Sequence, residues 1–167
     1  MASTDSSIAQ EVWRTLLQEF SDVADASDVT RIVLRLSMAV LLGGIIGYER
    51  ESKGKAAGLR THMVVALGAA LFVLVPLQLG MDTRDMSRIY QGVIAGIGFL
   101  GAGAIIKLSE SQRVQGLTTA ASIWLVAAIG LAAGSGLEMT AILATLIALP
   151  ILALLSGLEP LIDNSRE

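Results

Sequence analysis

The sequence contains no cysteine and a single histidine, His62. Disulfide bonds are therefore excluded, and so are the usual zinc sites, which need thiolates or several imidazole groups. Nucleophilic catalysis lacks a convincing set of residues, because His62 is the only base of the usual kind to activate a serine or threonine. We therefore expect a protein that is not an enzyme and that has no cofactor.

Charged residues are also scarce, at 16% of the 167 residues, against about 25% in soluble globular proteins. The formal net charge is −3, so no excess of basic residues indicates a nucleic-acid partner. The mean hydropathy is +0.67, and many of the 17 glycines stand inside apolar runs. This combination is typical of helices in lipid, so the bilayer is the expected partner of most of the chain.

Five apolar segments of about 17 to 22 residues each predict five transmembrane helices, because a helix of that length crosses about 30 Å of hydrocarbon. The segments are apolar on all sides, unlike the one-sided helices of a soluble bundle. They are Val29–Tyr48, Thr61–Leu79, Tyr90–Ile106, Leu117–Ala133 and Leu137–Leu158. The predicted fold is an all-α polytopic membrane protein. Its parts are an N-terminal segment (1–28), a five-helix transmembrane domain (29–159) and a tail (160–167).

The N-terminal segment predicts a separate amphipathic helix over Ser7–Ala24. Its apolar residues recur at helical spacing, and acidic residues occupy the remainder. The apolar residues are Ile8, Val12, Trp13, Leu16, Leu17, Phe20 and Val23. Such a helix lies along a membrane interface or packs on its own protein, and the sequence leaves both alternatives open.

The distribution of basic residues predicts the orientation of the chain. With five spans, the loops 49–60 and 107–116 and the C-terminus share one side, and that side carries more lysine and arginine than the other. Positive charge stays in the cytoplasm. We therefore expect a multi-pass membrane protein with its N-terminus outside and its C-terminus in the cytoplasm.

The stretch GIGFLGAG, residues 96–103, matches the G-x-G-x-x-G pattern of dinucleotide-binding loops. That pattern needs a strand before it and an acidic residue about 20 positions later, whereas here it lies inside an apolar run with Gly116 and Ala121 at those positions. Small residues that let helix backbones approach in lipid are the better interpretation. The predicted packing residues are Gly43, Gly47, Gly92, Gly96, Gly98, Gly101, Gly103, Gly130 and Gly134. We expect the 90–106 helix to be central and in contact on two sides; a passage along its glycines is the alternative.

No aspartate or glutamate lies deep in any apolar segment, which counts against an ordinary ion-coupled transporter. The densest polar site is the loop that begins at Glu49. Carboxylates of Glu49 and Glu51 could hold Mg²⁺ there; the alternative is ordinary charge at a membrane boundary. Arg35 is expected to reach the outer interface or to pair with Asp28, Asp82 or Asp85, and Asp85 is expected to cap the third apolar helix.

Three long stretches resemble the membrane domain of the MgtC/SapB family: GGIIGYERESKGKAAGLRTH, RIYQGVIAGIGFLGAGAII and VQGLTTAASIWLVAAIG. The resemblance covers about residues 29–136. It implies a bacterial inner-membrane protein with about five spans, an external N-terminus and a link to magnesium limitation. Some members of the family are virulence factors, and some are thought to restrain the ATP synthase. Longer members carry a C-terminal domain resembling ACT domains, so this chain is expected to be either the short form or a piece of a longer protein.

Carried over by position, the family's polar signature falls on nine residues, to which the sequence itself adds Glu51. This predicted functional polar cluster consists of Glu49, Arg50, Glu51, Lys55, Arg60, Thr61, Arg88, Gln91, Thr118 and Thr119. The expected function is non-enzymatic and linked to magnesium homeostasis, with regulation of membrane energetics or virulence. The chain would act as a homodimer or other homo-oligomer, or with another membrane complex. The alternative is a channel or carrier for Mg²⁺ or another cation.

Overall fold

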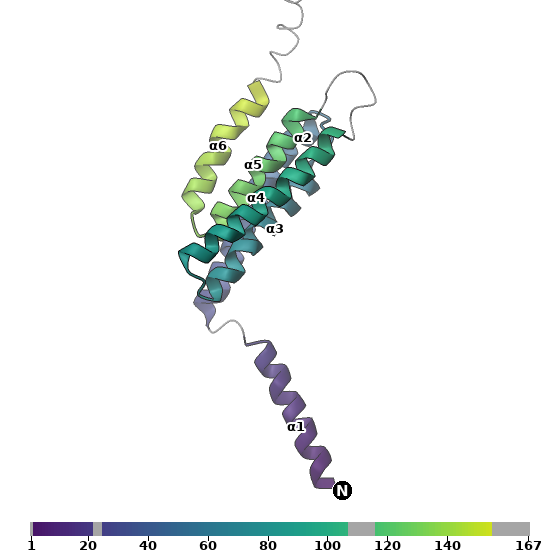
Figure 1. Cartoon of the computed structure of the whole chain (residues 1–167), viewed down its shortest axis with the longest axis vertical. Helices are drawn as coiled ribbons and strands as arrows, with labels where there is room; N and C mark the ends of the chain where they lie inside the picture. Colours follow the sequence, from purple (N-terminus) through teal and green to yellow (C-terminus); the bar gives the residue numbers. More distant parts are fainter. Residues whose placement is uncertain (1, 22–24, 107–115, 155–167) are drawn as a thin grey trace, which may run out of the picture. The chain divides into compact units, whose positions relative to one another are not determined.

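In the computed structural model, the structure describes residues 2–21, 25–106 and 116–154. Within these ranges the chain is helical and contains no strand (Figure 1). The helices are α1 (Ala2–Glu19), α2 (Ala26–Ser52), α3 (Leu59–Gln78), α4 (Thr83–Ile106), α5 (Leu117–Gly134) and α6 (Glu138–Leu154). The predicted all-α fold is confirmed.

The chain separates into two compact units, residues 1–33 and 34–167. The first unit holds α1 and the beginning of α2. Asp25 caps α2, because its Oδ1 accepts hydrogen bonds from the backbone N–H groups of Ser27 and Asp28 at 2.8 and 2.9 Å. The hydrogen bond from the Asp28 backbone, followed by that from the Ser27 hydroxyl, lowers the pKa of Asp25 below its usual value. The apolar side chains of α1, including Trp13 and Phe20, are exposed.

Four helices, α2 to α5, are long and apolar enough to cross a membrane, and α6 is a shorter apolar helix. The predicted fifth segment extends to Leu158, and its last four residues lie outside the described ranges. The largest difference in bounds is at α4, which begins at Thr83 rather than Tyr90. Asp82 is its cap, since Asp82 Oδ1 accepts a hydrogen bond from the Asp85 N–H at 2.9 Å. The expectation that Asp85 is the cap is therefore wrong; Asp85 lies in the first turn.

The central helix of the second unit is α5, which packs against α3, α4 and α6. Half of the apolar stretch of α5 is buried, compared with 6% of the apolar stretch of α4. The expectation of a central 90–106 helix is therefore wrong. The spacing of small residues shows that another helix can approach closely. Several helices of this chain have that spacing, so it does not identify which helix is central.

Two glycine pairs lie at close approaches of helix backbones. On α5, a Cβ added at Gly130 would lie 2.9 Å from Ala66 Cα, and one added at Gly134 would lie 2.7 Å from Ala70 Cα. On α2, a Cβ at Gly43 would lie 2.8 Å from the Ala66 Cβ. A Cβ at Gly47 would lie 2.8 Å from the Cα of Leu59. Both α2 and α5 are thus seated on α3 at backbone distance.

Arg35 lies at the end of the second unit where α5 passes into α6. Its Nη1 donates to the carbonyl oxygen of Gly134 at 3.3 Å, and its Nε lies 3.9 Å from Glu138 Oε1. These partners differ from the aspartates that the sequence suggested. A cation is favourable here because the last carbonyl groups of a helix carry partial negative charge.

Candidate functional site

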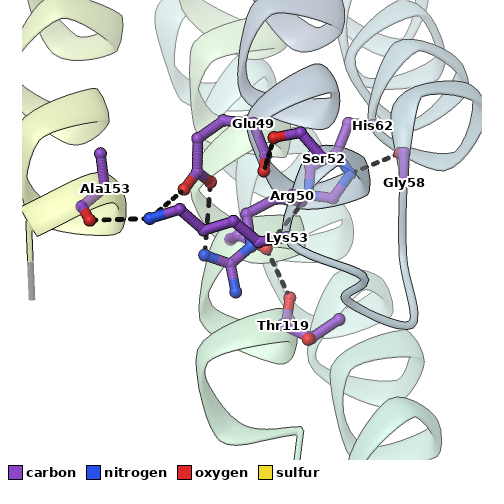
Figure 2. A network of polar contacts seen from close by, with 9 residues as sticks. Glu49, Arg50, Ser52, Lys53, Gly58, His62, Thr119 and Ala153 are labelled. Carbon is purple, nitrogen blue, oxygen red and sulfur yellow. Dashed lines mark hydrogen bonds and ion pairs between the residues drawn. The ribbon is translucent and has the colours of Figure 1, made fainter. Parts of the chain in front are cut away.

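The opposite end of the second unit gathers polar groups from α2, α3, α5 and α6 (Figure 2). The last turn of α2 supplies Glu49 and Arg50, and Lys53 follows directly after the helix. The first turn of α3 supplies His62, and the first turns of α5 supply Thr119 and Ser122. We call these six residues the boundary cluster. The end of α6 completes it, since Lys53 Nζ donates to the carbonyl oxygen of Ala153 at 2.7 Å.

The local structure that positions this cluster begins with the end of α2. Gly54 takes a left-handed backbone conformation with φ +64°, which glycine adopts without steric cost. The Lys55 N–H then donates back to the Arg50 carbonyl oxygen at 3.0 Å, and the Gly54 N–H donates to Glu51 O at 2.9 Å. The chain therefore reverses within a few residues and starts α3 beside the last turn of α2.

Arg50 is the most enclosed charged group of the cluster, with 1% of its side chain exposed. Its Nη1 lies 3.4 Å from Glu49 Oε2, a long separation for a charge-assisted hydrogen bond, which is typically about 2.7–2.9 Å. Its Nε and Nη2 have no hydrogen-bond partner among the described residues. Removing a charge from water is costly unless it is paired and fully hydrogen-bonded, so Arg50 is incompletely satisfied.

Glu49 pairs with two cations. Its Oε1 lies 3.2 Å from Lys53 Nζ, one helical turn further on, and 12% of its side chain is exposed, compared with 31% for Lys53. The same Oε1 makes no hydrogen bond of good geometry, so the contact with Lys53 is an ion pair without directed bonding. The boundary cluster thus combines the two cations Arg50 and Lys53 with the single carboxylate of Glu49.

Glu51 has a different role, because it faces α3 rather than Arg50. Its Oε2 accepts a hydrogen bond from the Leu59 N–H at 2.7 Å. The N-cap position of α3 is Gly58, whose missing side chain cannot satisfy the first amide groups of the helix. Glu51, eight residues before Leu59, therefore provides the hydrogen-bond acceptor that the side chain of an N-cap residue normally provides.

His62 and Ser122 connect α3 to α5 in the interior. His62 Nδ1 lies 2.8 Å from the carbonyl oxygen of Gly58, and its Nε2 lies 3.0 Å from Ser122 Oγ. The Ser122 hydroxyl donates to the Thr119 carbonyl oxygen at 2.8 Å. All three side chains are buried. Since buried polar groups need partners, this chain of contacts fixes the register of α3 against α5.

The predicted functional polar cluster divides between the two ends of the bundle. Glu49, Arg50 and Thr119 belong to the boundary cluster, and Glu51 adjoins it. Arg60, Thr61 and Thr118 are exposed at the same end, where Lys55 takes part through its backbone. Arg88 and Gln91 are exposed in the first turns of α4, and α4 begins at the opposite end of the bundle (Figure 1). The sequence grouping missed Lys53, His62 and Ser122, although the Glu49–Lys53 and Thr119–Ser122 spacings put each pair on one helix face.

The described residues place no third metal-binding side chain beside Glu49 and Glu51, where a magnesium site was predicted. Among residues 2–21, 25–106 and 116–154, no three His, Cys, Asp or Glu side chains come together as a metal site would require. Glu49 is occupied by cations and Glu51 by a backbone amide. A site on these two carboxylates therefore stays a prediction.

Three glycines of α4 line hollows on the surface of the second unit: Gly92, Gly96 and Gly103. A Cβ added at Gly92, Gly96, Gly98 or Gly103 would meet nothing within 4 Å, and one at Gly101 would make ordinary contact with Ala120. An apolar hollow of about 500 Å³ between α3 and α4 is lined by Gly68, Gly92 and Gly96, among others. A second hollow, of about 460 Å³, includes Gly103, Thr61 and Thr119. A packing role for Gly92, Gly96, Gly98 and Gly103 would thus need a partner surface outside the described residues.

The fold and the boundary cluster together define a polytopic helical membrane protein with a cluster of buried and half-buried polar groups at one end of the bundle. Comparison with known proteins identifies the family within this class. The sequence model described as "MgtC family" matches residues 36–161, and the chain belongs to that family.

Three relatives illustrate the similarity. The chain is 47% identical over 122 residues to "Protein SrpB" of Synechococcus elongatus, covering 66% of this chain and 67% of SrpB. It is 46% identical over 112 residues to "Putative magnesium transporter YhiD" of Escherichia coli, covering 63% and 51%. It is 43% identical over 128 residues to "Protein MgtC" of Brucella abortus, covering 77% and 52%. The match thus spans about half the length of the latter two relatives. No solved structure matches the chain significantly.

Proposed function

We propose that this chain is a non-enzymatic protein of the bacterial inner membrane that acts in magnesium homeostasis by assembling with itself or with another membrane complex. Membership of the MgtC family supports the membrane setting, and the printed description of YhiD supports the link to magnesium. Changes in membrane energetics or virulence would be the cellular consequence. In the proposed orientation the boundary cluster lies at the cytoplasmic face, and the N-terminus lies outside.

The observation that carries this proposal is the excess of positive charge in the boundary cluster. Arg50 and Lys53 face one carboxylate, Glu49. A path for Mg²⁺ needs oxygen ligands or rings of acidic side chains at its mouth. A buried guanidinium group at that place repels a divalent cation. The arrangement therefore favours a regulator over a cation pathway.

Magnesium flux into liposomes tests the proposal directly. Purified protein is inserted into vesicles that contain a magnesium-sensitive dye, and a Mg²⁺ gradient is imposed. We expect flux no greater than in empty vesicles, although size-exclusion chromatography shows folded protein. In a bacterium that lacks its own family member, expression of the same chain should restore growth at low Mg²⁺. Growth restored without flux is the signature of a regulator.

A magnesium transporter is the second candidate, favoured by the description of YhiD, which is 46% identical over the matched region. In that case Glu49 would be the acidic group of the inner mouth. Flux above that of empty vesicles, reduced by Glu49→Gln but unchanged by Glu11→Gln, would establish the transporter and refute the regulator. Glu11 is a suitable control because it lies on α1, which belongs to the other unit.

Self-association through α4 is the assembly that we propose. The open glycines of α4 would let a second helix approach at backbone distance, and a two-fold dimer is the commonest arrangement of identical chains. The absence of native cysteine makes the test simple. Oxidation of Gly96→Cys in native membranes should give disulfide-linked dimers, whereas Leu146→Cys, on the exposed side of α6, should not. Equal cross-linking of both variants would count against an α4 interface.

A further inference from the structure

The guanidinium group of Arg50 presents two hydrogen-bond donors for which the described residues supply no acceptor. Nε and Nη2 are both enclosed and both without a partner. Figure 2 shows one terminal nitrogen of Arg50 directed at Glu49 and the other directed away from it. A buried donor that has given up water without gaining an acceptor is costly. The position of these two atoms therefore indicates that something else binds them.

The two open donors lie on the same edge of the planar guanidinium group. In arginine, the Nε–H bond and one Nη2–H bond point in nearly the same direction, and this edge binds the two oxygens of a carboxylate or phosphate at once. Glu49 contacts Nη1, which belongs to the other side of the group. The bidentate edge is thus the unoccupied one.

The charge of the cluster specifies the sign of the missing group. Arg50 and Lys53 carry two positive charges, and Glu49 supplies one negative charge. His62, on α3, contacts two neutral groups, the carbonyl oxygen of Gly58 and the hydroxyl of Ser122. These contacts add no negative charge to the cluster. One negative charge would complete the balance, and a phosphate diester carries one.

We propose that the Nε/Nη2 edge of Arg50 binds the oxygens of a phosphate group at the membrane boundary. The cluster lies where α2 ends and α3 begins, and both helices are long and apolar enough to cross a membrane. The end of a spanning helix meets the phosphate headgroups. Lys53 is the most exposed of the three charged residues, so the phosphate enters past Lys53. Because Nε and Nη2 are closed to solvent in the described structure, binding requires a local movement of side chains and exchanges slowly.

The arginine Nε–H signals of the ¹⁵N-labelled protein, in a maltoside detergent free of phosphate, provide the test. Exposed arginines exchange their Nε–H with water, whereas an enclosed Nε–H that gains an acceptor gives a sharp, shifted signal. Three probes are added in turn: dioleoylphosphatidylglycerol, dioleoylglycerol, which has the same chains but no phosphate, and inorganic phosphate. We expect the phospholipid to shift one Nε–H signal to a new position and dioleoylglycerol to leave the spectrum unchanged. The same signal with inorganic phosphate would identify a free anion as the source, and a signal with the phospholipid alone would identify a lipid headgroup.

Variants assign the signal to Arg50. In Arg50→Lys the positive charge remains but the bidentate edge is lost, so the new signal should be absent. Apparent affinity for the phospholipid should then fall by about tenfold or more, because a hydrogen bond to a charged group contributes at least the ~1.4 kcal/mol that corresponds to tenfold. The matched control Arg60→Lys changes an exposed arginine at the same end and should keep both. If Arg50→Lys does not fold, the wild-type titration still decides.

Two outcomes would overturn the proposal. One is a wild-type spectrum that no phosphate probe changes. The other is a signal that persists equally in Arg50→Lys and Arg60→Lys. The proposal goes beyond the magnesium function, since binding is measured on purified protein without Mg²⁺. Failure here would leave the flux and growth experiments unaffected.

Discussion

The close approach of α5 to α3 at Gly130 makes a sharp prediction about stability. A methyl group added by Gly130→Ala would lie 2.9 Å from the Cα and 3.0 Å from the carbonyl carbon of Ala66, and closer still to its carbonyl oxygen. These are backbone atoms, so no change of rotamer relieves the contact, and the two helices must separate. Overpacking of this kind costs about 1–3 kcal/mol, while the helix propensity of alanine returns about 0.5–1 kcal/mol.

The expected net effect of Gly130→Ala is a loss of about 1 kcal/mol of stability. For a chain of this size that corresponds to a fall in Tm of about 2–4 °C. Gly96→Ala is the matched control on α4, because nothing lies within 4 Å of its added Cβ. In that variant only the propensity term remains, so Tm should be unchanged or slightly raised. Thermal unfolding in detergent, followed by circular dichroism, measures both variants.

A second substitution separates a backbone contact from a side-chain contact. Ala66→Gly removes the Cβ of the residue that Gly130→Ala would strike, but leaves its backbone in place. The double variant should therefore be no more stable than Gly130→Ala alone. Rescue by Ala66→Gly, or a rise in Tm for Gly130→Ala equal to that for Gly96→Ala, would refute the packing of α5 on α3 described above.

Three further predictions concern the ends of the helices and the first unit. Glu51→Ala should lower Tm more than Glu51→Gln, because glutamine keeps an acceptor for the first amide of α3; the cost of losing a cap is about 1 kcal/mol, and thermal unfolding measures it. Ser122→Ala should cost about 1–3 kcal/mol, since it leaves buried His62 without its Nε2 partner, whereas the exposed Ser37→Ala should leave Tm unchanged. If α1 lies in the membrane interface, Trp13 fluorescence should shift to shorter wavelength when vesicles are added to a variant whose other tryptophan is phenylalanine; an unchanged spectrum would leave α1 in water.

The fold was predictable because the apolar runs of the sequence are long enough to identify membrane-spanning helices. Apolar runs that are apolar on every side identify spans by length alone, and four of the five predicted segments coincide with helices α2 to α5. The identity of the central helix was not predictable, because Gly92–Gly96 and Gly130–Gly134 have the same spacing. Which pair meets a neighbouring backbone depends on how the helices are arranged around α5, and that is a tertiary property.

The candidate site was predictable only where residues are neighbours in sequence. Glu49 and Arg50 stand in one charged run, so their common location was expected. His62 and Ser122 are 60 residues apart, and neither alone differs from an ordinary interface or helix residue. The family resemblance grouped Arg88 and Gln91 with Glu49 and Arg50, yet the alternation of spans places Arg88 and Gln91 at the other end of the bundle.

The charged run at the end of α2 shows how one helix separates adjacent charges. Each residue of an α-helix is rotated by about 100° from the one before, at 3.6 residues per turn. Glu49 and Lys53 are thus on one face and pair, Arg50 turns into the bundle, and Glu51 turns toward the first amide of α3. The three consecutive charges therefore have three functions: ion pairing, a buried donor edge and a helix cap. Neutralising Glu49 should break an ion pair, neutralising Arg50 should remove the buried donor edge, and neutralising Glu51 should weaken the cap of α3. The three residues therefore do not act as a single acidic or basic patch.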